Sequence, residues 1–150
     1  MHFGLGYLLW AQGKWDEAAN EFDLELQNDP QNVKARIYLA DSWVQLNEFA
    51  KALPELENLD ARDKSYPLVH RDLGIIYANS SRLEDAIREL RTAMESDPGD
   101  SELHLQAANV YRSLGRSDQA NAEAERARKL PPPRPTSLQE MIDSIETPAP

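Results

Sequence analysis

The chain has 150 residues, the size of one ordinary domain, and 41% of them are hydrophobic while 28% are charged, the balance of a globular protein. The absence of cysteine excludes disulfides and thiolate metal sites, and a net charge of −10 makes nucleic acid and anionic lipid unfavourable partners. No apolar run approaches the roughly 18 residues that a transmembrane helix needs, and a cytoplasmic location is only the default expectation.

The hydrophobic pattern predicts an all-α chain. In one stretch, Leu73, Gly74 and Tyr77 share one helical face, and Leu83 and Ala86 begin a similar face on the next helix. Taken in chain order, we expect eight helices near residues 2–12, 16–28, 34–46, 48–61, 68–79, 82–95, 102–113 and 116–129.

A fixed spacing of 34 residues runs through these helices. Small residues recur at Gly6, Ala40, Gly74 and Ala108, and again at Ala18, Ala52, Ala86 and Ala120. Large apolar residues recur at Leu9, Trp43, Tyr77 and Tyr111, and the spacing also joins Leu5, Leu39, Leu73 and Ala107. Small residues let two helices cross closely while large ones fill the flanks, so the spacing predicts repeated helical hairpins.

The predicted turns obey the same spacing. Gly13, Asn47, Ser81 and Gly115 fall between the helices of each pair, where Gly and Asn tolerate the left-handed conformation that ends a helix and Ser does so less well. Prolines after the second helices, such as Pro98, stop the helix before them.

The chain resembles the tetratricopeptide repeat family over nearly its whole length. The third unit matches best, with signature residues Leu73-Gly74, Tyr77, Ala86, Ala93 and Pro98 in order. The resemblance implies a right-handed α-solenoid of four helix-turn-helix units plus a C-terminal capping helix. The expected units are residues 1–32, 33–66, 67–100 and 101–133, followed by a proline linker, capping helix and disordered end at 134–150.

Two regions depart from the pattern. Pro54 lies inside a predicted helix, where a proline costs about 3 kcal/mol, so we expect a kink there. Lys64 replaces the proline that ends the second helix in the other units and Pro67 follows three residues later, so we expect a longer exit loop around 60–66. A hinge is the functional interpretation and a tolerated defect the favoured one. The first unit is rich in aromatic residues and has no helix cap, which favours a fragment of a longer protein.

The last segment continues the repeat register. Ser137 and Glu140 form a capping box before an apolar face at Leu138, Met141, Ile142 and Ile145. We expect this segment to cover the last repeat, although docking into a neighbouring molecule, or recognition of the preceding proline run, is the alternative.

Neither a metal site nor catalysis is expected. His2, His70 and His104 occupy one position of the repeat, so they lie on different hairpins about 8–10 Å or more apart, too far to share one ion. Recognisable nucleophile, dinucleotide and calcium motifs are missing. We therefore predict no enzyme activity and no cofactor.

A peptide-binding groove is the remaining candidate site. In the family, first helices line a concave face along which an extended or helical peptide lies. The matching positions here are Phe3, Tyr7, Trp10, Lys34, Ile37, Tyr38, Asp41, Leu68, Arg71, Asp72, Ile75, Asn79, Gln106, Asn109 and Arg112.

The family's chaperone-binding members hold a peptide carboxylate with lysine, asparagine and arginine. The matching positions carry Phe3, Tyr7, Tyr38, Leu68 and Asp72, so we expect no binding of acidic chaperone tails. The sequence predicts a scaffold that binds a protein or peptide. The alternatives are a structural module that self-associates through its aromatic N-terminal face, or the recruiting part of a larger enzyme.

Overall fold

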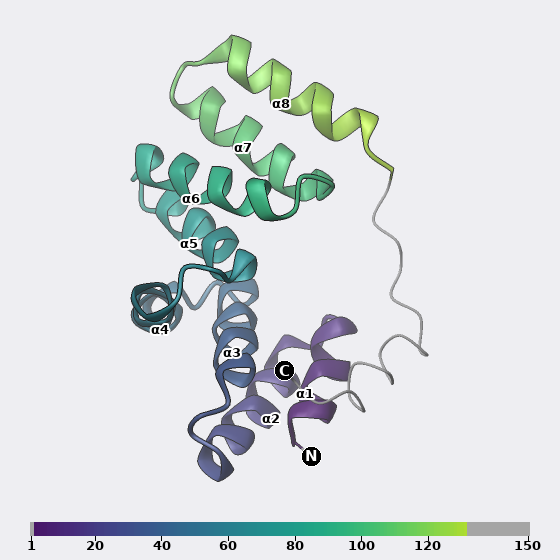
Figure 1. The fold of residues 1–150 in the computed structure, drawn as a ribbon, viewed down its shortest axis with the longest axis vertical. Coiled ribbons are helices and arrows are strands. Elements are labelled where there is room, and N and C mark those ends of the chain that lie inside the picture. The colour runs from purple at the N-terminus through teal and green to yellow at the C-terminus, as the bar shows by residue number, and fades with distance from the viewer. Residues whose placement is uncertain (1, 132–150) are drawn as a thin grey trace. The chain divides into compact units, whose positions relative to one another are not determined.

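The computed structural model describes residues 2–131, and within that range α-helices joined by short loops are the only regular secondary structure (Figure 1). Every helix boundary lies within one residue of its predicted position, which confirms the all-α prediction. The helices are α1 (His2–Ala11), α2 (Trp15–Asn28), α3 (Val33–Gln45), α4 (Phe49–Arg62), α5 (Pro67–Asn79), α6 (Leu83–Ser96), α7 (Ser101–Ser113) and α8 (Ser117–Lys129).

The helices fall into two compact units, residues 1–55 and 56–133, with the boundary inside α4. In the first unit α1 packs on α2, and both contact α3. In the second unit α5 packs on α6, α6 on α7 and α7 on α8, so consecutive helices pair as hairpins (Figure 1). The first helices of neighbouring hairpins also touch, α5 against α7.

The turns inside the hairpins have the predicted left-handed backbone. Gly13 and Gly115 have φ values of 76° and 75°, and the non-glycine residues Asn47 and Ser81 have φ values of 60° and 61°. Positive φ is costly for a residue with a Cβ, so the chain keeps this geometry even where its residue type disfavours it.

The two helices of a hairpin approach each other so closely at their crossing that only a small residue fits there. A Cβ built on Gly6 would lie 2.8 Å from Cε1 of Phe22, and one built on Gly74 would lie 2.8 Å from Cγ of Leu90. Ala86 is fully buried. The 34-residue spacing of small residues therefore marks the crossings of each hairpin, as predicted.

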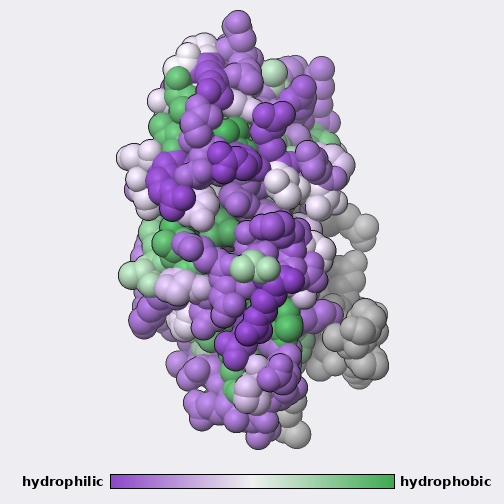
Figure 2. Space-filling view, turned by 60° about the vertical axis from the view of Figure 1, so that its left-hand side comes forward, coloured by the Kyte–Doolittle hydropathy of each residue, from purple (hydrophilic) through white to green (hydrophobic). Residues whose placement is uncertain are grey.

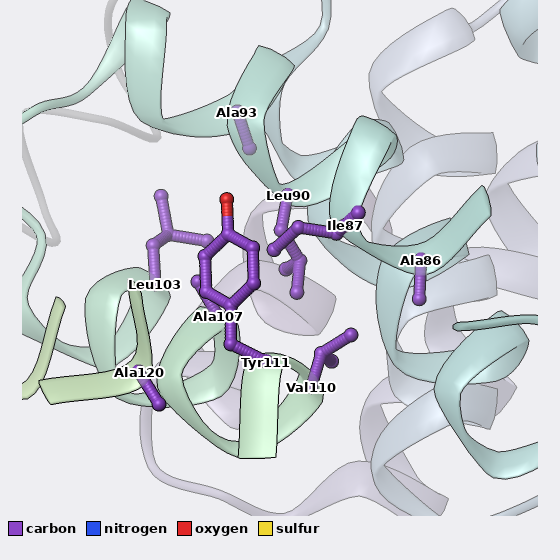
Figure 3. Close-up of a cluster of buried hydrophobic side chains, with 9 residues drawn as sticks. All are labelled: Ala86, Ile87, Leu90, Ala93, Leu103, Ala107, Val110, Tyr111 and Ala120. Carbon is purple, nitrogen blue, oxygen red and sulfur yellow. The ribbon is translucent and has the colours of Figure 1, made fainter. Parts of the chain in front are cut away.

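Each unit has its own hydrophobic core. In the second unit the ring of Tyr111 lies among Leu90, Leu103 and Ala107, which come from α6 and α7 (Figure 3). In the first unit Phe22 is the largest fully buried side chain. Leu5 is the exception among its repeat equivalents, since 48% of its surface stays exposed on α1.

The expectation of a longer exit loop after Pro54 is wrong. Helix α4 runs across Pro54 without interruption to Arg62, and the loop that follows has four residues, 63–66, as do the loops 29–32 and 97–100. Leu56 and Leu59, which follow the proline, are buried, and their burial offsets the hydrogen bond that proline cannot make. The kink stays a prediction.

The predicted capping helix lies outside the described residues. Its apolar face at Leu138, Met141, Ile142 and Ile145 therefore remains an expectation from the sequence alone.

Candidate functional site

A hollow of about 360 Å³ opens along the first helices of the second unit. Ile75 and Asn79 of α5 line it from one side, and Gln106 and Asn109 of α7 line it from the other. The structure thus brings together four of the predicted groove residues. The remaining lining residues are Ala78, Leu83, Leu90, Glu102, Val110 and Ser113.

The walls of this hollow combine apolar surface with amide groups. Asn79 and Asn109 are exposed at its rim. The Asn79 side chain donates to the Ile75 carbonyl at 2.9 Å, and Arg112 donates to Oδ1 of Asn109 at 3.1 Å. Among the described residues that line the hollow, Glu102 is the one that carries a charge. Such a site can bind apolar side chains and hydrogen-bond a peptide backbone.

Several other predicted groove residues are buried. Ile37, Asp41 and Asp72 lie in the interior and are closed to a ligand in this structure. Arg71 lies on the same helix as Asp72, with its Nε 3.7 Å from Oδ1 of that carboxylate. Partly or fully exposed positions remain at Lys34, Leu68, Arg71 and Arg112.

The predicted N-terminal aromatic residues form one cluster. The Tyr38 ring lies 4.8 Å from Trp10, 5.5 Å from Tyr7 and 6.1 Å from Phe3, measured between ring centroids. It also stacks on the buried Phe22 at 5.9 Å. These rings pack on one another and on the core of the first unit, with their outer surface only partly exposed.

A buried carboxylate supports this cluster. Nε1 of Trp10 donates to Oδ2 of the fully buried Asp41 at 2.6 Å. Burial, and then the neighbouring Tyr7 and Asp41, raise the pKa of Tyr38 to about 12. Trp10 and Tyr38 therefore have structural roles, whatever they contribute to binding.

The histidines form pairs with glutamates that the sequence analysis missed. Nδ1 lies 2.8 Å from a Glu21 carboxylate oxygen in His2, 2.6 Å from Glu89 in His70 and 2.6 Å from Glu123 in His104. In the remaining unit, Arg36 takes the histidine position and lies 3.5 Å from Glu55. Each pair joins the first helix of a hairpin to its second helix.

A second bond ties three of these residues to the preceding loop. Nε2 of His70 lies 2.8 Å from the Lys64 carbonyl, and Nε2 of His104 lies 2.9 Å from the Pro98 carbonyl. Arg36 donates in the same way to the Pro30 carbonyl at 3.0 Å. Every residue of this arrangement is 34 positions from its equivalent.

The two bonds fix the protonation of the buried histidines. A carbonyl and an ionised carboxylate only accept hydrogen bonds, so the form of His70 and His104 that makes both bonds is the imidazolium, in which both ring nitrogens donate. Burial by itself would lower the pKa of His104, but the bonds to Glu123 and Pro98 outweigh it and raise that pKa. Burial would likewise lower the pKa of His70, but the bonds to the Lys64 carbonyl and to Glu89 outweigh it and raise that pKa.

The signal for these pairs is present in the sequence. Glu21, Glu55, Glu89 and Glu123 share the 34-residue spacing, 19 residues after each histidine or arginine. In the sequence these glutamates look the same as solvent-exposed glutamates, because helical periodicity alone does not show which polar residue faces the partner helix.

A second and larger hollow, of about 750 Å³, lies on the side of α6 and α8. Met94, Tyr111 and Leu130 give it apolar surface, while Arg91 and Arg126 are among its charged residues. The sequence did not predict this hollow, because its two sides come from second helices, which the family pattern does not assign to the groove.

A family model described as tetratricopeptide repeat matches residues 9–74 and 77–139. The chain belongs to the tetratricopeptide repeat family. This confirms the resemblance stated from the sequence, and members of this family are generally non-enzymatic scaffolds for protein interactions.

Known relatives agree with this assignment. An uncharacterized protein of Haemophilus influenzae is 30% identical over 99 residues, covering 66% of this chain and 55% of its own length. Tetratricopeptide repeat protein 6 of Homo sapiens is 25% identical over 127 residues, covering 85% of this chain and 24% of its own. The chain thus spans about half or less of the curated relatives it matches.

Solved structures show the same fold. TTC0263, a thermophilic TPR protein of Thermus thermophilus, aligns with a TM-score of 0.73 and 30% identity over 86% of this chain and 72% of that one. MamA of AMB-1 aligns with a TM-score of 0.66 and 25% identity over 87% and 76%. MamA of Desulfovibrio magneticus RS-1 aligns with a TM-score of 0.72 at 21% identity over 86% and 73%, which shows the fold alone.

One face of the molecule is mainly hydrophilic and carries only small, separate hydrophobic patches (Figure 2). Within the described residues, no helix combines the length and apolar character needed to cross a membrane.

Proposed function

We propose that this tetratricopeptide repeat chain binds a peptide segment of a partner protein in the hollow between α5 and α7. The observation that carries the proposal is the convergence of Ile75, Asn79, Gln106 and Asn109 from two first helices onto one hollow. These residues come from two consecutive repeats whose first helices are in contact, as a groove along stacked hairpins requires.

The chemistry of the hollow favours an uncharged or basic peptide. Asn79, Gln106 and Asn109 carry amides, which can both donate to and accept from a peptide backbone. Glu102 and the net charge of −10 disfavour an acidic ligand. The buried Asp72, at a position matching the family's carboxylate clamp, argues further against an acidic chaperone tail.

Selection from a random-peptide phage library, followed by fluorescence anisotropy, tests the proposal. Binding of the selected peptide should fall about ten-fold or more in the double variant Asn79→Ala/Asn109→Ala, because two amide hydrogen bonds are lost. Both side chains are exposed, so the fold should be unaffected.

The matched control is Arg88→Ala on the second helix α6, where the exposed guanidinium bonds only Asp85 on its own helix among the contacts described. It should bind as the wild type does. Equal losses in control and double variant, or a library that gives no saturable binder, would refute the groove.

Self-association remains the alternative function, and it would use the N-terminal helices α1 and α2 instead of the hollow between α5 and α7. Leu5 and Leu24 are exposed large hydrophobic residues on α1 and α2. Sedimentation of Leu5→Ser/Leu24→Ser tests this alternative better than substitution of Trp10, whose loss would leave the buried Asp41 without that indole donor. A wild-type monomer would contradict self-association.

A further inference from the structure

One of the four pairs that join a histidine or Arg36 to a glutamate differs from the others by an added carboxylate. Oδ1 of Asp60, in the last turns of α4, lies 3.7 Å from Nδ1 of His70, which itself lies 2.6 Å from Glu89. The three donor atoms all lie within 4.8 Å of one another. Three chain segments therefore present one nitrogen and two carboxylate oxygens to the same point.

We propose that Asp60, His70 and Glu89 bind a divalent transition-metal ion of the zinc type. Zinc accepts histidine nitrogen and carboxylate oxygen at about 2.0–2.2 Å, which places ligand atoms roughly 3.3 Å apart around the ion. The 3.7 Å between Nδ1 of His70 and Oδ1 of Asp60 is close to that value, and the 2.6 Å between Nδ1 and the Glu89 oxygen must widen by under about 1 Å. Because all three atoms lie within 4.8 Å of one another, the two carboxylates need to approach by about 1.5 Å at most. A water molecule would complete the four ligands.

The surroundings favour a built site over a chance cluster. The side chains of His70, Asp60 and Glu89 are only 6%, 17% and 18% exposed. The other oxygen of Asp60, Oδ2, pairs with Nζ of Lys64 at 3.0 Å, whereas Oδ1 is buried, lies 3.7 Å from Nδ1 of His70 and accepts no hydrogen bond within the described residues. A bound cation would satisfy this oxygen, which is otherwise costly to bury.

The orientation of the histidine also fits a metal ligand. The Lys64 carbonyl accepts a hydrogen bond from Nε2 at 2.8 Å and so leaves Nδ1 as the nitrogen that faces both carboxylates. Metal-binding histidines are commonly held by such a bond to their other ring nitrogen. The ion would replace the proton that Nδ1 donates to Glu89.

The adjacent repeat supplies an internal control. His104 repeats the bonds of His70, with Glu123 and the Pro98 carbonyl as partners, but Met94 stands where Asp60 would be. That site has one nitrogen and one carboxylate, too few ligands to hold zinc firmly. The proposal therefore assigns one ion to the chain, at the third repeat.

Calorimetric titration of the full chain with zinc chloride tests this assignment. The wild type should bind one equivalent, and Asp60→Met, which copies the fourth repeat, should weaken binding by roughly ten-fold or more. His70→Gln should do the same, whereas His104→Gln should bind as the wild type does. Magnesium, which prefers all-oxygen ligands, should not compete.

A thermal melt gives a second readout that separates binding from misfolding. Zinc should raise the Tm of the wild type and of His104→Gln, but not that of Asp60→Met. The assignment is overturned if the wild type shows no saturable binding, if Asp60→Met binds as tightly as the wild type, or if His104→Gln abolishes binding.

Discussion

At the crossing of α5 and α6, a single missing Cβ decides how closely two helices approach. We expect Gly74→Ala to destabilise the protein by about 1–3 kcal/mol, because the added Cβ would lie 2.8 Å from Leu90. Denaturant melts would measure the loss. Gly99→Ala is the control, since its Cβ would meet Asp97 at an ordinary 3.9 Å. A neutral Gly74→Ala would contradict the close crossing.

The buried imidazolium of His104 makes stability depend on pH. Its pKa is raised in the folded state, so its contribution is fully present below the unfolded value of about 6.5 and is lost as the pH rises through the higher folded value. We expect the free energy of unfolding to fall over that range, measured by urea melts at several pH values.

The variant His104→Gln isolates this effect. It should lower stability below about pH 6.5 and flatten the fall at higher pH, with the remaining slope due partly to His70. A slope identical to that of the wild type would show that the Glu123 and Pro98 bonds do not hold the proton.

At the scale of the helical hairpin, a non-glycine residue with positive φ in the turn lowers the free energy of unfolding, and one substitution can remove this strain. Ser81 has a φ of 61°, so Ser81→Gly should stabilise the protein by about 1 kcal/mol. Gly115 also has a positive φ, and a Cβ added there would meet no atom within 4 Å, so Gly115→Ser should destabilise by a similar amount through backbone strain alone. Melts that move both variants in the same direction would contradict this account.

The elements themselves were predictable from the sequence. Helix ends followed from the 34-residue spacing because the same small and large residues return at every crossing, as Gly6 and Gly74 show. The loop after α4 is shorter than predicted because Pro67 is the first residue of α5, so the absence of a proline at Lys64 does not lengthen the loop. The burial of Leu56 and Leu59, a tertiary effect, keeps α4 intact beyond Pro54.

The candidate site was less predictable than the fold. Family position identified Ile75, Asn79, Gln106 and Asn109, but it also included Ile37 and Asp41, which are buried. A repeat position sets which side of a helix a residue occupies, whereas exposure depends on the size of its neighbours in the adjacent hairpin. The larger hollow beside α6 and α8 was not expected, because most of its lining residues lie on second helices, which the family pattern does not assign to a groove.

At the scale of the whole molecule, the net charge of −10 should influence which peptides bind and how fast. We expect library selection to enrich lysine and arginine, and the association rate of a selected basic peptide to fall as salt is added, because screening weakens long-range attraction. Stopped-flow fluorescence at several salt concentrations measures that rate. A rate independent of salt would show that net charge plays no part.

The most direct test of the binding account is a nuclear magnetic resonance titration of the labelled chain with a selected peptide. The side-chain amides of Asn79, Gln106 and Asn109 give separate signals, and we predict that these shift together with the backbone of α5 and α7. Shifts confined instead to Arg91, Arg126 and their neighbours on α6 and α8 would place the ligand in the other hollow and contradict the proposed groove.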